Sequence, residues 1–256
     1  MRYYLLAGER SGDLHGANLL KGIRQADPQA EFRAWGGDLM QAEGAELVTH
    51  YTEMAFMGFW EVVKHAPTIW RLMRKCKRDL LEYKPDVLIL IDYPGFNLRM
   101  AAFAKQQGIR VFYYISPKVW AWNQRRAWKI KATVDELFVI FPFEVPFYQR
   151  YDFAVHYHGN PIVDALASFS PNPNFGTENQ LDSRPILALL PGSRTQEVKA
   201  MLPTMLRTAT QFEGYQVVVA GVNSLPRSLY EPFEMAYPSV RFVYDQTYDA
   251  VVAAEG

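Results

Sequence analysis

Polar residues that can bind anions follow an apolar run near residue 190. Pro191-Gly192-Ser193-Arg194 comes directly after Ile186–Leu190, and Glu197 lies in the first turn of the helix expected from Arg194 to about Phe212. A turn of small residues between a strand and a helix presents unpaired backbone N–H groups and the positive end of the helix dipole. Arg194 is placed to bind a phosphate through two parallel hydrogen bonds. Two interpretations stay open: a phosphate site, or an ordinary turn in which Ser193 caps the helix.

Carboxylates and glycines follow two other apolar runs. Val87–Ile91 is followed by Asp92-Tyr93-Pro94-Gly95-Phe96-Asn97, and Tyr3–Leu6 leads into Gly8-Glu9-Arg10-Ser11-Gly12-Asp13. Asp92 is either a general base that faces a cleft or the first residue of a helix-initiating turn. The glycine turn either brings the backbone close to a sugar or phosphate, with Glu9 and Asp13 beside it, or caps a helix through Ser11 or Asp13. It is not a GxGxxG motif, so a nicotinamide cofactor is not expected.

Two further loops carry candidate binding residues. Ser116-Pro117-Lys118-Val119-Trp120-Ala121-Trp122-Asn123 contains a pair of tryptophans. These side chains either contact a sugar ring or an acyl chain, or they belong to the core. Gly159-Asn160-Pro161 is a firm turn that closes the first half of the chain.

An alternation of apolar runs and helical stretches must position these loops. In the first half, strands are expected at Tyr3–Leu6, Phe32–Trp35, Val87–Ile91, Val111–Ile115, Glu136–Ile140 and Ala154–Tyr157. Helices are expected between them, at Asp13–Ala26, Trp60–Glu82, Leu98–Gln107, Arg125–Thr133 and Phe143–Arg150. Apolar runs without polar alternation, separated by helices, are typical of parallel sheets covered on both faces.

A segment rich in Pro, Asn and Ser then predicts a linker. The alternation resumes after it, with strands at Ile186–Leu190, Gln216–Ala220 and Val240–Tyr244. The sequence therefore predicts an α/β protein with two doubly wound, Rossmann-like parallel-sheet domains. Residues 1–167 form the first domain, 168–184 the linker and 185–256 a partial second domain, with ligands at the carboxyl ends of the strands.

Composition narrows the functional classes. Lys plus Arg and Asp plus Glu both number 27, so no overall field favours nucleic acid as a partner. The single Cys76 excludes a disulfide framework and a cysteine zinc cluster, and neither a metal nor a cofactor is expected. The N-terminus has no signal-peptide pattern and no window approaches a spanning helix, which predicts a soluble cytoplasmic protein.

One segment combines large apolar and cationic side chains. Met54–Lys64 leads into Trp70–Arg78, and six cationic residues lie between positions 64 and 78. Such a helix can lie on a membrane, with apolar side chains in the bilayer and cations on anionic headgroups. The residues expected to make this contact are Met57, Phe59, Trp60, Trp70, Arg71 and Arg74. The alternative is an ordinary amphipathic helix whose apolar stripe packs on the sheet.

Six motifs, in order along the chain, carry a resemblance to a known family. They are Gly8-Glu9-x-Ser11-Gly12-Asp13, Asp92-x-Pro94-x-Phe96-Asn97, Tyr114-Ile-Ser-Pro-x-Val-Trp-Ala-Trp122, Phe141-Pro-Phe-Glu144, Gly159-Asn160-Pro161-x-Val163-Asp164 and Leu190-Pro-Gly-Ser-Arg194-x-x-Glu197. Together they resemble lipid-A-disaccharide synthases, which are inverting glycosyltransferases of the GT-B architecture. The resemblance implies transfer of 2,3-diacylglucosamine from its UDP conjugate to the 6-hydroxyl of 2,3-diacylglucosamine 1-phosphate (lipid X), with no essential metal.

The resemblance also implies roles for the candidate residues. Asp92 is expected to be the catalytic base, with Glu9 and Ser11 as further catalytic candidates. Arg194 and the helix that begins beside it are expected to stabilise the UDP leaving group. The other expected substrate-binding residues are Gly192, Ser193, Asp13, Asn97, Asn160, Glu197 and Met201.

The resemblance implies a setting as well. The expected partners are the UDP-linked donor, the lipid X acceptor and the inner-membrane surface, where the protein associates peripherally; a homodimer is among the assemblies expected of a full-length form. The chain stops where the family continues, which predicts a shortened second domain whose three strands leave apolar surface open. Two alternatives remain: another UDP-sugar enzyme of this architecture, such as an N-acetylglucosaminyl transferase or a 2-epimerase, and a catalytically incomplete lipid-binding fragment.

Overall fold

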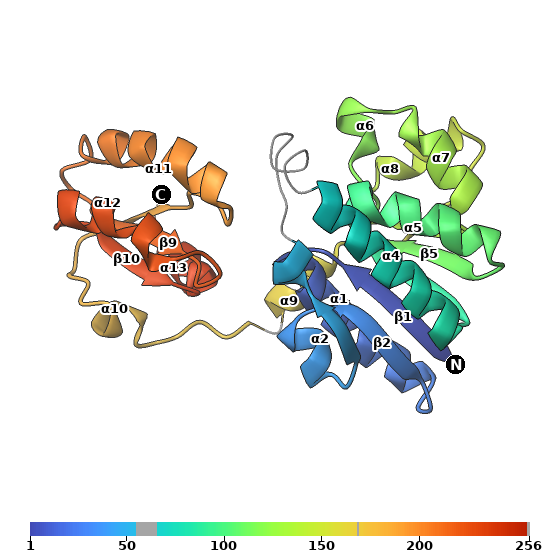
Figure 1. Cartoon of the computed structure of the whole chain (residues 1–256). Helices are drawn as coiled ribbons and strands as arrows, with labels where there is room; N and C mark the ends of the chain where they lie inside the picture. Colours follow the sequence, from blue (N-terminus) through green and yellow to red (C-terminus); the bar gives the residue numbers. More distant parts are fainter. Residues whose placement is uncertain (55–65, 168, 255–256) are drawn as a thin grey trace. The chain divides into compact units, whose positions relative to one another are not determined.

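The computed structural model describes residues 1–54, 66–167 and 169–254 of the chain (Figure 1). The chain divides into two compact units, Met1–Ala167 and Ser168–Gly256. Each unit is built around one parallel sheet with helices on both of its faces. The expected α/β class with two parallel sheets is therefore confirmed.

In the described part of the first unit, seven parallel strands have the order β3-β2-β1-β4-β5-β6-β7. Their bounds are β1 Arg2–Ala7, β2 Glu31–Gly36, β3 Glu46–His50, β4 Val87–Ile91, β5 Arg110–Tyr114, β6 Glu136–Val139 and β7 His156–Tyr157. From β1, strands β2 and β3 follow toward one edge of the sheet; from β4, strands β5, β6 and β7 follow toward the other edge. The strand order therefore reverses between β1 and β4, at the centre of the sheet.

Helices cover both faces of this sheet (Figure 1). Side chains of β1 alternate between them: Tyr4 and Leu6 pack with one cluster, Leu5 and Ala7 with the other. The helices on the first face are α4 Ala66–Tyr83, α5 Pro94–Gln106, α7 Arg126–Thr133 and α8 Glu144–Gln149. Those on the second face are α1 Arg10–Ala26 and α2 Asp38–Ala42. Shorter elements are η1 Tyr51–Met54, α6 Val119–Trp122 and α9 Pro161–Ala167.

Several bounds differ from those expected. Helix α1 begins at Arg10 instead of Asp13, and α5 begins at Pro94 instead of Leu98. Proline favours the first turn of a helix because its missing N–H would have no partner there, which explains the early start of α5. Strand β3 and helix α2 were not expected at all, because both are five residues long and rich in polar side chains.

The described part of the second unit holds three parallel strands in the order β10-β9-β8. They are β8 Ile186–Leu189, β9 Gln216–Gly221 and β10 Arg241–Tyr244. Helix α11 (Thr195–Ala209) packs in one cluster, with α12 (Glu231–Ala236) and η2 (Arg227–Leu229) beside it. On the other face lie α10 (Phe175–Glu178) and α13 (Thr247–Ala253).

One expectation about the second unit needs correction. The stretch 168–184 was expected to be a linker, but it contains α10, whose Phe175 is buried against Ile186 and Val218. Helices also reach both faces of the sheet despite its three strands. Apolar surface does remain open beside β8, where a groove of about 330 Å³ is lined by Leu187, Leu189, Met201, Thr204, Met205, Thr208, Ala209 and Phe212.

Candidate active site

Two of the candidate loops leave the first sheet side by side. Ala7 of β1 is in register with Ile91 of β4, so the segments beginning at Gly8 and Asp92 start from neighbouring strand ends. This is the point where the strand order reverses, and open α/β sheets bind ligands in the crevice that such a reversal creates. The structure therefore brings Glu9 and Asp92 close to the carboxyl ends of the two central strands.

The two loops touch through a glycine and an aromatic ring. A Cβ atom at Gly8 would lie 2.4 Å from the Tyr93 ring, so position 8 has no room for a side chain. The Tyr93 hydroxyl donates a hydrogen bond to the Met54 carbonyl oxygen at 2.7 Å. Burial, together with the charge of Glu9, raises the pKa of Tyr93 to about 12. Tyr93 is thus a fixed, uncharged side chain beside the ends of β1 and β4.

Asp92 is exposed at the end of β4 and has an unusual backbone conformation. Its φ angle is +43° and that of Tyr93 is +48°, so two consecutive residues with side chains lie in the left-handed region. The Asp92 carbonyl oxygen accepts hydrogen bonds from the Tyr113 hydroxyl at 2.6 Å and from Asn97 Nδ2 at 2.8 Å. The turn that carries the candidate base is therefore held from within the protein.

Asn97 belongs to this scaffold and not to the ligand-facing surface. Its side chain is fully buried. Besides Asp92, its amide nitrogen lies 3.2 Å from the Ile91 carbonyl oxygen and 3.3 Å from that of Leu6. The expectation that Asn97 binds substrate is corrected accordingly: it ties the ends of β1 and β4 together.

The N-terminal motif divides between surface and scaffold. Asp13 is 2% exposed, and its carboxylate accepts the backbone N–H groups of Gly37, Leu39 and Met40 at 2.8, 3.1 and 3.1 Å. It therefore holds the start of α2 and is not placed to bind substrate. Glu9 is the N-cap residue of α1 in place of Ser11 or Asp13, and it makes no side-chain cap. Glu9 is half-buried and Ser11 exposed, so both are accessible at the end of β1.

In the second unit, a carboxylate already lies at the N-terminus of α11. Glu197 Oε2 accepts the Ser193 backbone N–H at 3.1 Å, and Glu197 Oε1 accepts a hydrogen bond from Arg194 Nη1 at 3.0 Å. Gly192 has a φ of +104°, and a Cβ there would lie 2.5 Å from Glu197 Oε2. The expected cap by Ser193 is wrong, because the N-cap residue is Arg194 and no side chain caps the helix. The turn nevertheless binds an anion, which here is its own glutamate.

Two other expected substrate-binding residues have different surroundings. The Asn160 side-chain oxygen accepts the Ile162 N–H at 3.1 Å, at the start of α9. Met201 is 49% exposed and lines the apolar groove between α11 and β8.

Sequence reasoning missed Tyr93 and Tyr113. Tyr93 stands at a variable position of its motif, and Tyr113 lies inside an apolar strand.

Glu144 of the Phe141-Pro-Phe-Glu144 motif has a structural role. It is 1% exposed, and its Oε2 accepts the N–H groups of Ile140 and Phe141 at 3.1 and 3.0 Å. Burial raises the pKa of this carboxyl, although the two N–H groups oppose the shift. A raised folded-state pKa means that the carboxyl contributes stability below its ordinary pKa and loses that contribution as the pH rises.

We therefore expect opposite results from two substitutions of Glu144. Glu144→Gln keeps an oxygen for both N–H groups and removes the buried charge, so at pH 7 it should be at least as stable as the parent. Its advantage should shrink as the pH falls toward 5. Glu144→Ala leaves both donors unpaired and should cost about 1–3 kcal/mol. Urea unfolding between pH 5 and 8 measures both effects, and a glutamine variant less stable than the parent at pH 7 contradicts this account.

Helix α4 presents the described part of the expected membrane segment. Trp70 is 53% exposed, Arg71, Arg74 and Arg78 are exposed on the same helix, and the Arg74 guanidinium lies 3.6 Å from the centre of the Trp70 ring. The opposite face packs on the sheet through Leu72, Cys76 and Leu80. The segment is thus both amphipathic and core-packed. Met57, Phe59 and Trp60 lie outside the described residues.

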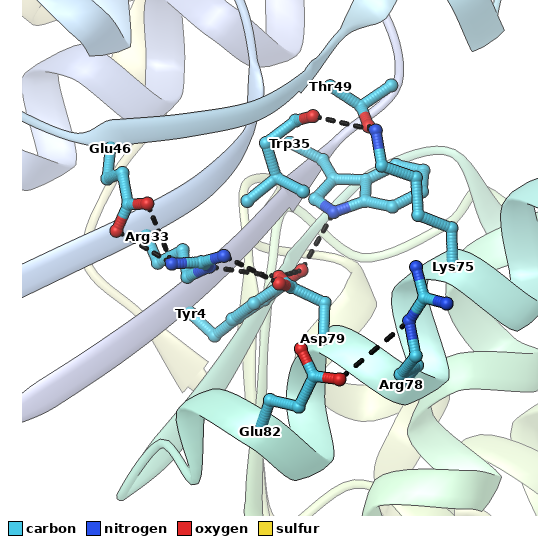
Figure 2. Close-up of polar contacts among 10 residues, drawn as sticks. Tyr4, Arg33, Trp35, Glu46, Thr49, Lys75, Arg78, Asp79 and Glu82 are labelled. Carbon is cyan, nitrogen blue, oxygen red and sulfur yellow. Dashed lines mark hydrogen bonds and ion pairs between the residues drawn. The ribbon is translucent and has the colours of Figure 1, made fainter.

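A polar network fastens α4 to the sheet (Figure 2). The Asp79 carboxylate accepts hydrogen bonds from the Tyr4 hydroxyl and from Arg33 Nε and Nη2, at 2.5, 3.0 and 2.7 Å. Lys75 Nζ donates to the Thr49 hydroxyl at 2.8 Å and to the Val48 carbonyl at 2.9 Å. These contacts join α4 to three neighbouring strands, which fixes the direction in which its basic face points.

The fold and the site define a GT-B-like α/β protein. A solved UDP-GlcNAc 2-epimerase from Neisseria meningitidis, bound to UDP-GlcNAc, matches 98% of this chain and 74% of its own with a TM-score of 0.67 at 12% identity. A UDP-GlcNAc 2-epimerase from Methanocaldococcus jannaschii, in complex with UDP-GlcNAc and UDP, matches 100% of this chain and 77% of its own with a TM-score of 0.65 at 13% identity. At such identities the likeness concerns the fold alone.

The chain belongs to the lipid-A-disaccharide synthetase family, whose model matches residues 3–255. The lipid-A-disaccharide synthase of Trichlorobacter lovleyi is 46% identical over 209 residues, which are 81% of this chain and 55% of that protein. The one from Chromohalobacter salexigens is 38% identical over 249 residues, 95% of this chain and 64% of that protein. The chain thus spans about half to two thirds of the length of these relatives. Among the helices of the described residues, none has the length and apolar character needed to cross a membrane.

Proposed function

We propose that this chain carries the acceptor side and part of the donor side of a lipid-A-disaccharide synthase. The reaction moves 2,3-diacylglucosamine from its UDP conjugate to the 6-hydroxyl of 2,3-diacylglucosamine 1-phosphate, giving a β-1,6-linked disaccharide 1-phosphate and UDP. The family match over residues 3–255 supports this assignment. The observation that carries it is the position of Asp92, an exposed carboxylate at the reversal point of the sheet, on a turn held from within the protein.

The proposed chemistry is one in-line displacement. The acceptor 6-hydroxyl loses its proton to the Asp92 carboxylate while its oxygen attacks C1 of the donor sugar. The bond between C1 and the diphosphate oxygen breaks with inversion at C1, and its electron pair leaves with UDP. Glu9 and Ser11, at the neighbouring strand end, are proposed to contact the acceptor sugar.

Arg194 and the first turn of α11 are proposed to stabilise the leaving UDP. A diphosphate anion gains from backbone N–H groups and from a guanidinium aimed at its developing charge. The Glu197 carboxylate occupies such a position, since it accepts from both Ser193 and Arg194. In this proposal the diphosphate replaces Glu197 on these donors, and Glu197 keeps Arg194 ordered in its absence.

The acyl groups of the substrate separate this function from its alternatives. The gene product that contains this chain should form disaccharide 1-phosphate and UDP from UDP-2,3-diacylglucosamine and lipid X, detected by mass spectrometry. Turnover confined to unacylated UDP-N-acetylglucosamine would point to another UDP-sugar enzyme. Binding to lipid vesicles without any affinity for UDP in calorimetry would point to a lipid-binding fragment.

Since the proposed substrates are lipids, we propose that the enzyme works at the cytoplasmic side of the inner membrane and that α4 makes the contact. Arg71, Arg74 and Trp70 lie on its exposed face. Each cation near an anionic surface contributes about 1 kcal/mol. Arg71→Gln combined with Arg74→Gln should therefore weaken binding to vesicles that contain anionic lipid by about 30-fold, measured by co-sedimentation.

A matched control comes from helix α1, which packs on the other face of the sheet. Lys21→Gln with Arg24→Gln removes the same charge there, and vesicle binding should change by less than about threefold, because distant charges are screened. Equal losses in the two double variants would mean that overall charge, and not α4, governs binding.

A further inference from the structure

The turn at the end of β4 stores backbone strain next to the proposed base. Asp92 and Tyr93 have φ angles of +43° and +48° in succession. A residue with a side chain in the left-handed region costs about 1–3 kcal/mol, and it persists where surrounding contacts enforce it. Aspartate tolerates this region better than tyrosine does. Something in the surrounding structure must therefore hold the peptide between Asp92 and Tyr93.

Two buried donors hold that peptide by a single oxygen. The Asp92 carbonyl accepts the Tyr113 hydroxyl at 2.6 Å and Asn97 Nδ2 at 2.8 Å, so both of its lone pairs are used. The two donors come from different elements, because Tyr113 lies on β5 and Asn97 on α5. Their directions converge on the carbonyl and fix the orientation of the peptide plane.

Tyr113 is suited to act as a permanent donor. Its side chain is fully buried, and it is in register with Leu90, two residues before Asp92. Burial raises the pKa of its phenol well above the ordinary value, so the hydroxyl keeps its proton at every working pH. The ring is fixed by the surrounding core, which leaves the hydroxyl little freedom to move away from the Asp92 carbonyl.

We infer that Tyr113 is a positioning residue for catalysis: its hydroxyl, together with Asn97, locks the left-handed turn that directs the Asp92 carboxylate to the acceptor hydroxyl. Tyr113 acts through the backbone and does not touch the substrate. The inference rests on the proposed function, in which Asp92 is the base. Because a displacement of about 1 Å can cost up to 100-fold in rate, losing this bond should be visible in turnover.

Tyr113→Phe removes one oxygen and keeps the ring. In the gene product that contains this chain, kcat for disaccharide formation should fall about 10- to 100-fold with little change in either KM. Tyr148→Phe is the matched control, since Tyr148 is also fully buried and its hydroxyl hydrogen-bonds Ser116 Oγ at 2.6 Å. That variant should keep kcat within about twofold, although it loses a comparable buried hydrogen bond.

A double-mutant cycle separates positioning from general damage. With Asp92→Asn already present, adding Tyr113→Phe should change the residual rate less than about twofold, because the group being positioned is gone. The inference is overturned if Tyr113→Phe lowers the rate by the same factor in the parent and in the Asp92→Asn background. It is also overturned if the rate does not change, or if Tyr113→Phe shows no cooperative thermal unfolding transition and is therefore not folded. A parent without transferase turnover overturns the proposed function and this inference with it; an active parent beside an unaffected Tyr113→Phe overturns the inference alone.

Discussion

Asp92→Asn should lower kcat by about 10²- to 10⁴-fold, the range that removal of a general base produces. The amide has the shape of the carboxylate but cannot take up the proton of the acceptor hydroxyl. The backbone should keep its conformation, because the bonds from Tyr113 and Asn97 end on the Asp92 carbonyl and not on its side chain. Steady-state kinetics should therefore show the loss in kcat, while calorimetry shows UDP binding with an unchanged Kd.

Asp152 provides the control for this substitution. It is exposed and also has a left-handed backbone, with φ of +51°, and its carboxylate pairs with Lys131 on the surface. Asp152→Asn should leave kcat within about twofold, because an exposed ion pair of this kind contributes little. A near-normal rate in Asp92→Asn would remove Asp92 from the role of base. If Glu9→Gln then abolished turnover, the role would pass to Glu9, the carboxylate at the neighbouring strand end.

The central part of the fold follows from the sequence because buried parallel strands have a simple pattern. Val87–Ile91 is apolar at every position, and β4 has the bounds that this run predicts. Edge elements lack that pattern: β3 reads Glu-Leu-Val-Thr-His and is half-buried. Its polar residues serve the surface and the network around α4, so a single chain gives no periodic signal for a strand there.

The candidate loops also follow from the sequence, but the direction of each side chain does not. Asp13 and Asn97 are each the fourth residue of a helix that follows a strand end, where a polar residue can face a ligand or satisfy the protein's own backbone. Their partners decide between these roles, and each of the two residues has at least one partner that is distant in sequence: Gly37 lies 24 residues from Asp13, and Leu6 lies 91 from Asn97. Glu197 shows the converse, since its partners Ser193 and Arg194 are local.

The largest stability loss is expected from Asp79→Asn. Removing one partner of a buried ion pair costs about 3–5 kcal/mol, because the remaining charge loses its compensation. The Arg33 side chain is 24% exposed, so the expected loss lies at the lower end of this range. Asp79 is 7% exposed, and Arg33 directs two nitrogens at its carboxylate (Figure 2). An asparagine would turn an N–H group toward this guanidinium or toward the Tyr4 hydroxyl. Glu46 is the other partner of Arg33, but its side chain is 65% exposed, so it compensates the Arg33 charge only partly.

Urea unfolding followed by tryptophan fluorescence measures this loss, and Glu82→Gln is its control. Glu82 lies on the same helix and pairs with Arg78 at 3.8 Å, with both side chains exposed (Figure 2). An exposed pair one helical turn apart contributes about 0.3–0.5 kcal/mol, so the control should stay close to the parent. Asp79 lies one helical turn beyond Lys75, and both residues fasten α4 to the sheet. Asp79→Asn should therefore also loosen the attachment of α4 to the sheet and weaken vesicle binding, although no residue of the exposed basic face has changed. A loss below 1 kcal/mol for Asp79→Asn would mean that apolar packing by Leu72, Cys76 and Leu80 suffices to hold the helix.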